Sequence, residues 1–282
     1  MKVSVIQMNM RSLESKANFD RAEALVRRAV GENGPDVVVL PETWNTGFMP
    51  AGDLAAACDE NAKAVRARFS PLARELNVNI VAGSVSNNRG GHIYNTACVF
   101  DRAGACIAEY DKTHPFTPMG EHEVYTPGDH LVTFTLDSVR CGLLICYEVR
   151  FPELWRTLAL RGAQVMFLPA QWTAARQYHW ETLTAARATG LAASITPQDK
   201  HTVTSAAAVL CHILRRLCRR VPCCTTGSIR RVNSGEGGAS VSGSSDASSA
   251  AIRCAPCRST RSYVISVIQS ILPFPAPAAA RP

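Results

Sequence analysis

Cys146 stands where a thiol can act as a nucleophile. The apolar residues 143–145 (LLI) predict the end of a strand, and residues 151–154 (FPEL) carry the start signal of a helix. A side chain at such a strand-to-helix turn is exposed at the edge of a sheet, and the free backbone N–H groups of the turn point at the group that it attacks. Free cysteine is also among the most buried residue types, so the position of Cys146 alone favours a packed core thiol.

Two further strands end on a residue that can take part in catalysis. Glu42 follows the apolar run 36–40, and Lys112 follows the predicted strand 105–110. The carboxyl ends of strands form the usual active-site edge of an α/β sheet. Either residue alone would more often be an ordinary solvated charge. Three strands that each end on one reactive residue are far less expected by chance, so the sequence favours a shared site.

These residues need a regular scaffold, and the first 188 residues predict one. Strands are predicted at 2–7, 36–40, 78–83, 94–100, 105–110, 131–136, 139–145 and 165–168, with hairpins between 94–100 and 105–110 and between 131–136 and 139–145. Helices are predicted up to Gly31, over 65–76 with a kink or restart at Pro71, from Pro152 to Gly162, and over 174–188. We expect an α/β fold in which helices cover the outer faces of mixed sheets.

The charge is unevenly distributed along the 282 residues. The formal net charge is +7, but residues 189–282 hold 11 Lys and Arg against three Asp and Glu, which leaves the first 188 residues near neutral at −1. These first 188 residues, called the body below, are nearly neutral and give no reason to expect nucleic acid as a partner. No apolar run approaches the roughly 18 residues that span a membrane, and residues 1–10 predict a short strand instead of a signal peptide. We therefore expect a cytoplasmic protein with no membrane partner.

The 11 cysteines divide in the same uneven way. Five lie in the body, at positions 58, 98, 106, 141 and 146, and their spacing matches no metal motif. In a cytoplasmic protein they should be reduced. We expect no metal and no other cofactor.

Residues 189–282 break the pattern of the body. They contain ten arginines but one lysine, a serine-rich stretch at 234–249 and a Pro- and Ala-rich end. Residues 206–217 predict a short helix and 263–272 a short apolar segment, but neither continues the earlier alternation. The segment can be a disordered tail, a separate small module or a translation product of the wrong reading frame. Its Arg, Ala, Ser, Pro and Cys content favours the last.

Three blocks of the body resemble the catalytic blocks of the nitrilase superfamily of carbon–nitrogen hydrolases. They are residues 41–48 (PETWNTGF), 111–116 (DKTHPF) and 141–153 (CGLLICYEVRFPE), and their order and spacing fit as well. Within that superfamily the chain looks most like the ω-amidase branch, because of residues 44–48 (WNTGF), 118–122 (PMGEH), and 171–172 (QW) followed by 179–180 (HW). The resemblance covers roughly residues 1–188.

The resemblance implies a nitrilase-type αββα sandwich and a Glu-Lys-Cys triad. Glu42 would be the general base, Cys146 would attack the amide carbon to give a thioester and ammonia, and Lys112 would stabilise the oxyanion together with a backbone N–H near Tyr147. Glu121 matches the second glutamate found beside the family's triad, and its expected role is to orient Lys112 and the substrate. The family commonly pairs two such sandwiches, although a homodimer is doubtful for a chain with this tail.

An ω-amidase substrate is a small molecule such as 2-oxoglutaramate or 2-oxosuccinamate, with a carboxylate distant from the scissile amide. Arg150 and Arg176 are candidate partners for that carboxylate, because a guanidinium binds it by a bidentate fork. A surface or structural role is at least as common for such arginines. Large aromatic residues are more often plain core. The candidates for the pocket wall are Trp44, Phe48 and Trp172, with Tyr147 beside the nucleophile.

The resemblance stops near residue 188, where the family continues with a buried strand that this chain does not show. We interpret the change as a frameshift near codon 188, which resequencing of the gene tests. The fold would then be incomplete at its C-terminus, because strands of the body would lose sheet neighbours. Net stabilities of about 5–15 kcal/mol do not absorb the loss of several core side chains at about 2–5 kcal/mol each.

Two alternative functions stay open. A related enzyme would hydrolyse N-carbamoyl amines or a deaminated peptide, and ammonia release from each substrate separates these from an ω-amidase. A protein of another class would bind zinc or nucleic acid through the tail. Its candidate residues are Arg215, Arg216, Arg219 and Arg220 with Cys218, Cys223, Cys254 and Cys257. Cys223-Cys224 is a poor zinc knuckle, so the tail is the weaker alternative.

Overall fold

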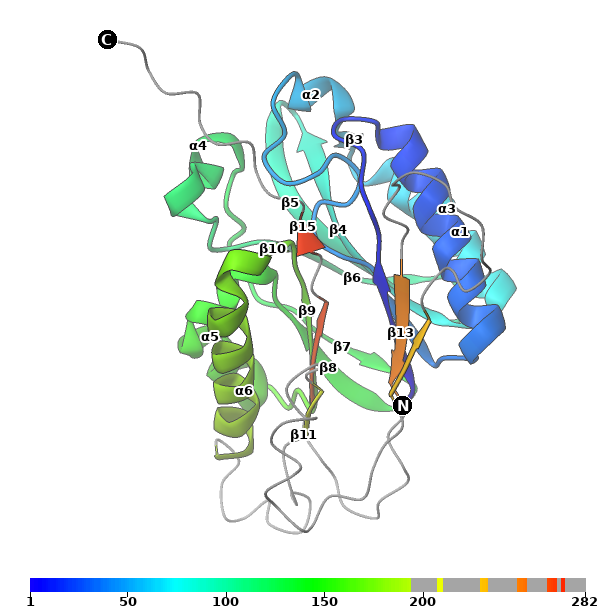
Figure 1. Ribbon diagram of the computed structural model, residues 1–282, viewed down its shortest axis with the longest axis vertical. Coiled ribbons are helices and arrows are strands. Elements are labelled where there is room, and N and C mark those ends of the chain that lie inside the picture. The colour runs from blue at the N-terminus through cyan, green and yellow to red at the C-terminus, as the bar shows by residue number, and fades with distance from the viewer. Residues whose placement is uncertain (194–206, 210–228, 233–247, 253–262, 268–269, 272–282) are drawn as a thin grey trace, which may run out of the picture.

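Two sheets pack face to face, and helices cover their outer faces (Figure 1). The computed structural model describes residues 1–193, 207–209, 229–232, 248–252, 263–267 and 270–271. The first sheet has the order β12-β13-β1-β2-β4-β5-β6, and the second has the order β11-β14-β9-β8-β7. The expected α/β sandwich with the layers αββα is confirmed. No helix within these described ranges is long and apolar enough to cross a membrane.

The first sheet is built from consecutive segments of the chain. Its strands are β1 (Val3–Gln7), β2 (Val37–Val39), β4 (Asn79–Arg89), β5 (His92–Phe100) and β6 (Cys106–Asp111), and the short β3 (Asp59–Glu60) pairs with β4. Strands β1, β2 and β4 are parallel, whereas β4, β5 and β6 form an antiparallel meander. The crossovers between the parallel strands contain α1 (Ser15–Asn33), α2 (Leu54–Ala57) and α3 (Lys63–Leu76).

Helices α1 and α3 cover the outer face of the first sheet. Each has an apolar stripe with helical spacing, such as Phe19, Ala22 and Val26 on α1. Helix α1 does not stop at Gly31, as predicted, but ends where Gly34 adopts a left-handed φ of +49° and its N–H bonds to Val30. Helix α3 also continues through Pro71 without a restart. Buried residues on both sides of Pro71, Phe69 and Leu72 among them, hold both halves of α3 on the sheet.

The second sheet begins with the predicted hairpin. Strands β7 (Thr133–Leu136) and β8 (Val139–Leu143) are joined by Asp137 and Ser138, which both have positive φ, as tight hairpin turns require. Helix α5 (Pro152–Leu160) then crosses over to β9 (Val165–Pro169), which pairs in parallel with β8. After β10 (Trp172–Thr173) and a 3₁₀ turn (Ala174–Arg176), helix α6 runs over Gln177–Ala193.

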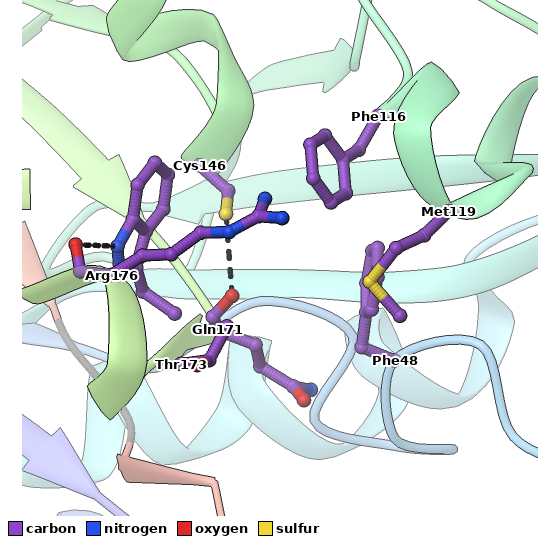
Figure 2. A pocket seen from close by; sticks show the side chains of 8 residues that line it. Phe48, Phe116, Met119, Cys146, Gln171, Thr173 and Arg176 are labelled. Carbon is purple, nitrogen blue, oxygen red and sulfur yellow. Dashed lines mark hydrogen bonds between the residues drawn. The ribbon is translucent and has the colours of Figure 1, made fainter. Parts of the chain in front are cut away.

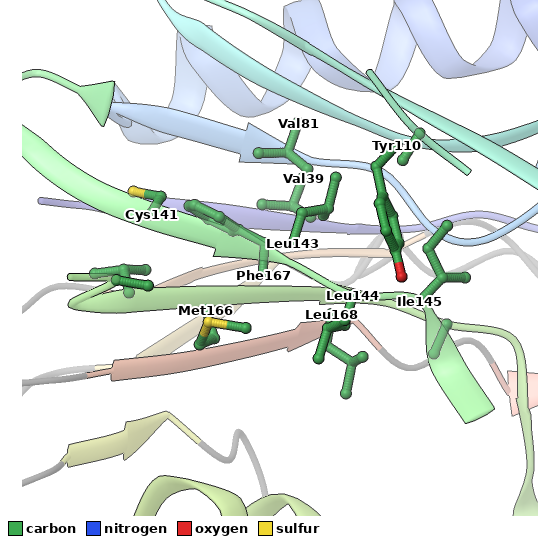
Figure 3. Packing of buried hydrophobic residues seen from close by; sticks show 14 of the residues in the cluster. Val39, Val81, Tyr110, Cys141, Leu143, Leu144, Ile145, Met166, Phe167 and Leu168 are labelled. Carbon is green, nitrogen blue, oxygen red and sulfur yellow. The ribbon is translucent and has the colours of Figure 1, made fainter. Parts of the chain in front are cut away.

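An apolar core lies between the sheets (Figure 3). Val39, Val81 and Tyr110 enter it from the first sheet, and Leu143 and Phe167 enter it from the second. Burial of each such side chain contributes about 1.5–3 kcal/mol. The core therefore fixes the position of the ends of β2, β6, β8 and β9 relative to one another.

Strands from beyond residue 193 pair with both sheets. Strand β13 (Ser248–Ile252) is antiparallel to β1, with β12 (Ile229–Val232) outside it. Strand β14 (Tyr263–Val267) is parallel to β9, with β11 (Ala207–Val209) outside it, and β15 (Ser270–Ile271) pairs with β10. The expectation that strands of the body lose sheet neighbours is therefore wrong for β1 and β9, whose outer backbone groups are paired.

Residues 207–209 form a strand, so the predicted helix over 206–217 is wrong there, because pairing with β14 satisfies this backbone instead. The remainder of that segment, residues 206 and 210–217, lies outside the described residues, as do all the arginines and cysteines of the alternative zinc or nucleic-acid site.

Candidate active site

Four strands end at one edge of the sandwich, and each is followed by a residue that reaches the same buried place. Glu42 follows β2, Lys112 follows β6, Cys146 follows β8 and Gln171 follows β9. Lys112 Nζ lies 2.9 Å from Glu42 Oε1, and the backbone nitrogen of Gln171 lies 2.9 Å from Glu42 Oε2. The Cys146 Sγ lies 3.4 Å from the backbone oxygen of the same Gln171, and the thiol is close enough to feel the charges of both Glu42 and Lys112. The structure thus brings together the three residues that the strand ends predict.

Lys112 is the centre of a buried ionic cluster. Its side chain is 1% exposed, and its ammonium group donates to Glu121 Oε1 at 3.0 Å and Oε2 at 2.8 Å, in addition to Glu42. Burial by itself lowers the pKa of Lys112, but the charges of Glu42 and Glu121 outweigh burial and raise that pKa above its usual value. Lys112 therefore carries a fixed positive charge on a side chain that is buried from solvent.

Glu121 lies beside the triad, where the resemblance places it. It starts the short helix α4 (Glu121–Val124), which follows a 3₁₀ turn (Thr117–Met119), and the backbone N–H of Phe116 donates to its carboxylate. Asn95, in β5, joins the two glutamates: its Nδ2 lies 3.0 Å from Glu42 Oε1 and 3.0 Å from Glu121 Oε1. Asn95 is not among the residues predicted from sequence, although a polar residue within an apolar strand is a signal, since buried polar groups need partners.

Cys146 occupies a strained turn. It begins a 3₁₀ turn (Cys146–Arg150) with a φ of +48°, a value that costs a residue other than glycine of the order of 1–3 kcal/mol. Its side chain is 6% exposed, and Sγ lies 3.4 Å from the backbone oxygen of Gln171. Tyr147 is the second residue of the turn, so its N–H has no partner within the turn. That N–H is the one that the sequence analysis assigns to an oxyanion.

The surroundings of Cys146 hold the proton on sulfur. Burial raises the pKa of the thiol well above its usual value, and the charge of Glu42 raises it further, while the charge of Lys112 lowers it. A neutral thiol becomes a strong nucleophile only when a base removes its proton during the attack. The neighbouring Glu42 carboxylate is placed to be that base.

Gln171 holds the site from the fourth strand end. Its side-chain nitrogen donates to the backbone oxygen of Glu42 at 2.7 Å and to Thr43 Oγ1 at 3.0 Å, while its backbone contacts the Glu42 carboxylate and Cys146 Sγ. Gln171 belongs to the sequence blocks that carry the resemblance but is not among the predicted site residues. Its place directly after a buried strand is the same signal that singles out Glu42 and Lys112.

A small pocket opens over Cys146. Figure 2 shows the Cys146 sulfur in it, with Arg176 extended past the sulfur and Phe48, Phe116 and Met119 opposite. The predicted residues Phe48, Trp172 and Arg176 line this pocket, and so do Phe116, Met119, Gln171 and Thr173, which the sequence analysis did not place there. Apolar walls with few polar groups are typical of small-molecule sites.

Arg150 and Tyr147 form the layer next to this pocket. The Arg150 guanidinium lies over the rings of Tyr147 at 5.8 Å and Trp172 at 5.7 Å. The Arg176 guanidinium lies 5.5 Å from the centre of the Phe116 ring. Within the described part of the chain neither guanidinium forms an ion pair, so both can bind an anionic ligand.

Trp44 does not line the pocket, and its prediction as a pocket wall is wrong. It is fully buried, with its ring 4.7 Å from Phe19 and 5.5 Å from Phe69, and its Nε1 donates to the backbone oxygen of Ala82 at 2.6 Å. The Trp44 indole packs against the apolar faces of α1 and α3, on the outer side of the first sheet and away from Cys146.

The described residues offer no group of three or more His, Cys, Asp or Glu that could hold a metal ion. The profile of the carbon–nitrogen hydrolase family matches residues 2–193. The chain belongs to this family. It is therefore a carbon–nitrogen hydrolase, and the family match extends five residues beyond the predicted limit at 188, to the end of helix α6.

Relatives of this carbon–nitrogen hydrolase include named amidases. It is 36% identical over 186 residues to the 2-oxoglutaramate amidase of Bacillus subtilis (66% of this chain, 71% of the relative) and 32% identical over 199 residues to the human omega-amidase NIT2 (66% and 70%). It is 44% identical over 155 residues to a hydrolase in the agr operon of Staphylococcus aureus (54% and 59%). The chain thus spans about three fifths to seven tenths of the length of these relatives.

The fold also matches solved structures of the nitrilase superfamily. The structure of Nit3 from Saccharomyces cerevisiae, a member of branch 10 of that superfamily, aligns with a TM-score of 0.61 at 29% identity, over 68% of this chain and 72% of Nit3. The nitrilase-type sandwich that the resemblance implies is confirmed.

Proposed function

We propose that this carbon–nitrogen hydrolase is a thiol amidase of the ω-amidase type, which releases ammonia from a small amide that carries a distant carboxylate. One observation carries the proposal: the Glu42 carboxylate contacts Lys112 and the backbone nitrogen of Gln171, whose carbonyl oxygen lies 3.4 Å from Cys146 Sγ, beside a pocket that contains Arg176. A base, a nucleophile and a fixed cation are the three groups that cleavage of an amide by a thiol needs.

In the first half of the reaction Cys146 Sγ attacks the carbonyl carbon, and Glu42 takes the thiol proton. The carbonyl oxygen becomes an oxyanion, which the Lys112 ammonium and the Tyr147 N–H stabilise. The C–N bond then breaks while protonated Glu42 returns its proton to the departing nitrogen, so ammonia leaves and a thioester remains on Cys146. Glu121 and Asn95 keep the Lys112 and Glu42 side chains in place through hydrogen bonds of 2.8–3.0 Å.

In the second half a water molecule takes the place of ammonia. Glu42 accepts a proton from the water as its oxygen attacks the thioester carbon, and the same two donors stabilise the second oxyanion. The C–S bond then breaks, the proton on Glu42 returns to sulfur, and a carboxylic acid is released. The net reaction consumes one water and one amide and yields one acid and one ammonia, with Cys146 and Glu42 restored.

The pocket supports a substrate with a carboxylate at the end away from the amide. Arg176 lines the pocket and Arg150 lies over its wall at Trp172, and within the described residues neither has an acidic partner. A guanidinium recognises a carboxylate by paired hydrogen bonds. The relative from B. subtilis is named a 2-oxoglutaramate amidase and the human relative an omega-amidase, which supports 2-oxoglutaramate as the substrate to test first.

Ammonia release from 2-oxoglutaramate tests the proposal. We expect the wild-type chain to release it, and Cys146→Ala to lower the rate by at least about 10³-fold, because the covalent route is lost. Cys106→Ala, at the opposite end of β6, should stay within about twofold of wild type. During turnover, mass spectrometry of the wild-type peptide that contains Cys146 should show an acyl adduct.

Two outcomes would overturn the proposal. Activity that survives Cys146→Ala would exclude the thiol mechanism. Ammonia release from an N-carbamoyl amine with a higher kcat/KM than from 2-oxoglutaramate would assign the chain to another activity of the same family.

A further inference from the structure

Glu148 is a buried carboxylate that the proposed mechanism does not use. It lies two residues after Cys146 in the same 3₁₀ turn, and its side chain is 0% exposed. An isolated buried carboxylate is costly, so it persists only where several donors satisfy it. The donors around Glu148 come from the two segments that carry Lys112 and Cys146.

One carboxylate oxygen of Glu148 binds the segment of Lys112. Its Oε1 accepts from the hydroxyl of Tyr110 at 2.6 Å, and from the backbone nitrogen and the hydroxyl of Thr113 at 2.9 and 2.7 Å. The backbone nitrogen of His114 lies 3.2 Å from the same oxygen. These bonds fix the backbone directly after Lys112, at Thr113 and His114, and the side chain of Tyr110 two residues before it.

The other oxygen of Glu148 binds the segment of Cys146. Its Oε2 accepts from the backbone nitrogen of Ile145 at 2.7 Å, and the backbone nitrogen of Glu148 donates to the Ile145 oxygen at 3.1 Å. The backbone oxygen of Glu148 accepts from Trp155 Nε1 at 3.0 Å, which anchors the turn to α5. These bonds surround the residue with the strained φ, and strain of this kind persists only where neighbouring groups fix the backbone.

A carboxylate satisfies both sides of this arrangement. All the partners of Oε1 and Oε2 named above are donors, and a carboxylate is the one side chain with two oxygens that both accept. A glutamine would have to present an N–H group either to the donors of Thr113 or to the N–H of Ile145. One of the two segments would then lose its anchor.

We infer that Glu148 is a positioning residue. It fixes the distance between Cys146 and Lys112 by accepting hydrogen bonds from the backbone beside each of them. The inference rests on the proposed function for its catalytic readout, since it assigns to Glu148 the distance between the nucleophile and the cation that stabilises the oxyanion. A shift of about 1 Å between reacting groups can cost of the order of 10²-fold in rate.

Glu148→Gln tests this role, with Tyr110→Phe as a second, milder variant and Glu153→Gln as a matched control on the exposed face of α5. We expect Glu148→Gln to lower kcat for 2-oxoglutaramate by about 10–100-fold, with KM within about twofold, because the pocket walls are unchanged. Tyr110→Phe removes one donor and keeps the ring, so a loss of about three- to tenfold is expected. Glu153→Gln should match wild type.

Alkylation of Cys146 by iodoacetamide gives a second readout that needs no amidase activity. We expect the rate of alkylation, followed on the peptide that contains Cys146 and normalised to folded protein, to change by at least about fivefold in Glu148→Gln and in the same direction in Tyr110→Phe. A purely structural Glu148 would lower thermal stability but leave kcat and alkylation per folded molecule as in wild type.

The two inferences fail in different ways. If the wild-type chain releases no ammonia from any amide, the proposed function falls, while the alkylation rates still decide the role of Glu148. If amidase activity is present and both variants match wild type in kcat and alkylation, the role of Glu148 is overturned and the proposed function stands. Should Glu148→Gln fail to fold, Tyr110→Phe decides, because it preserves the packing of the core.

Discussion

The site has an inner end at the triad and an outer end at the two arginines of the pocket, and the charged groups differ in burial between them. At the inner end Glu42, Lys112 and Glu121 are each at most 1% exposed, and their charges pair with one another over 2.8–3.0 Å. At the outer end Arg150 and Arg176 are partly or fully exposed and have aromatic rings as neighbours. Removal of one inner charge leaves another buried charge without its partner, whereas either outer charge can be removed without that cost.

This difference follows from the cost of burying an ion. A charge moved from water into a protein loses several kcal/mol of solvation, which only close partners can offset. The inner cluster therefore keeps one geometry, suited to bond making and breaking. The outer guanidiniums keep their water until a ligand replaces it, which suits recognition. Substitutions at the inner end should change kcat and stability, and those at the outer end should change KM.

The largest effect is expected when Lys112 is replaced by methionine. Lys112→Met leaves Glu42 and Glu121 facing each other without a cation, so we expect a loss of about 3–5 kcal/mol in the free energy of unfolding. Activity should fall by at least about 10³-fold, because the oxyanion loses its charged donor. Chemical denaturation and ammonia release measure the two effects.

Lys63→Met is the matched control, since Lys63 is an exposed lysine at the start of α3. It should change the free energy of unfolding by no more than about 0.5 kcal/mol. If Lys112→Met were as stable and as active as Lys63→Met, the proposed contrast between the mutually dependent charges of the inner end and the separate charges of the outer end would be wrong.

The inner end could be predicted from sequence, because each of its main residues follows a strand. The hydrophobic patterns that predict β2, β6 and β8 also predict that Glu42, Lys112 and Cys146 come to one edge, and the structure places them there. The layers of the sandwich follow from the same periodicity. The local sequence pattern is therefore enough to predict the position of a side chain when that position is fixed by the direction of the strand before it.

Other features depend on contacts between distant segments and could not be predicted. Asn95 and Glu148 become important only through partners 26 to 53 residues away. Trp44 belongs to a catalytic block by sequence, yet packing against α1 and α3 decides its place in the core. The pairing of β13 with β1 and of β14 with β9 involves separations of about 100 residues or more, for which the tail shows no periodic signal.

A smaller effect, dependent on pH, is expected from Glu42→Gln. In wild type Glu42 accepts the thiol proton inside the site, so the rate of Cys146 alkylation should change little between about pH 6.5 and 8. In the variant the proton must leave for water. Burial is the largest cause that raises the pKa of the thiol, and it remains after the charge of Glu42 is removed, so the thiolate is the minor form in the variant and its fraction should rise about tenfold per pH unit.

The sign of this effect is specific. Glu42→Gln should react more slowly than wild type at the acid end of the range and approach wild type as the pH rises. Two parallel pH profiles would show that Glu42 does not serve as the base for Cys146, and the inner end would then lose its catalytic interpretation.

The smallest effect is expected at the outer end. Arg176→Met keeps a long side chain in the pocket but removes the cation, so KM for 2-oxoglutaramate should rise about tenfold, with kcat within about twofold. The size stays modest because an exposed guanidinium is partly screened by water. A neutral amide of similar length should show no change in KM, and Arg156→Met, on the exposed surface of α5, should resemble wild type with both substrates. If Arg176→Met instead lowered kcat for both amides to the same extent, the guanidinium would act on the reacting end, and the division of labour between the two ends of the site would have to be abandoned.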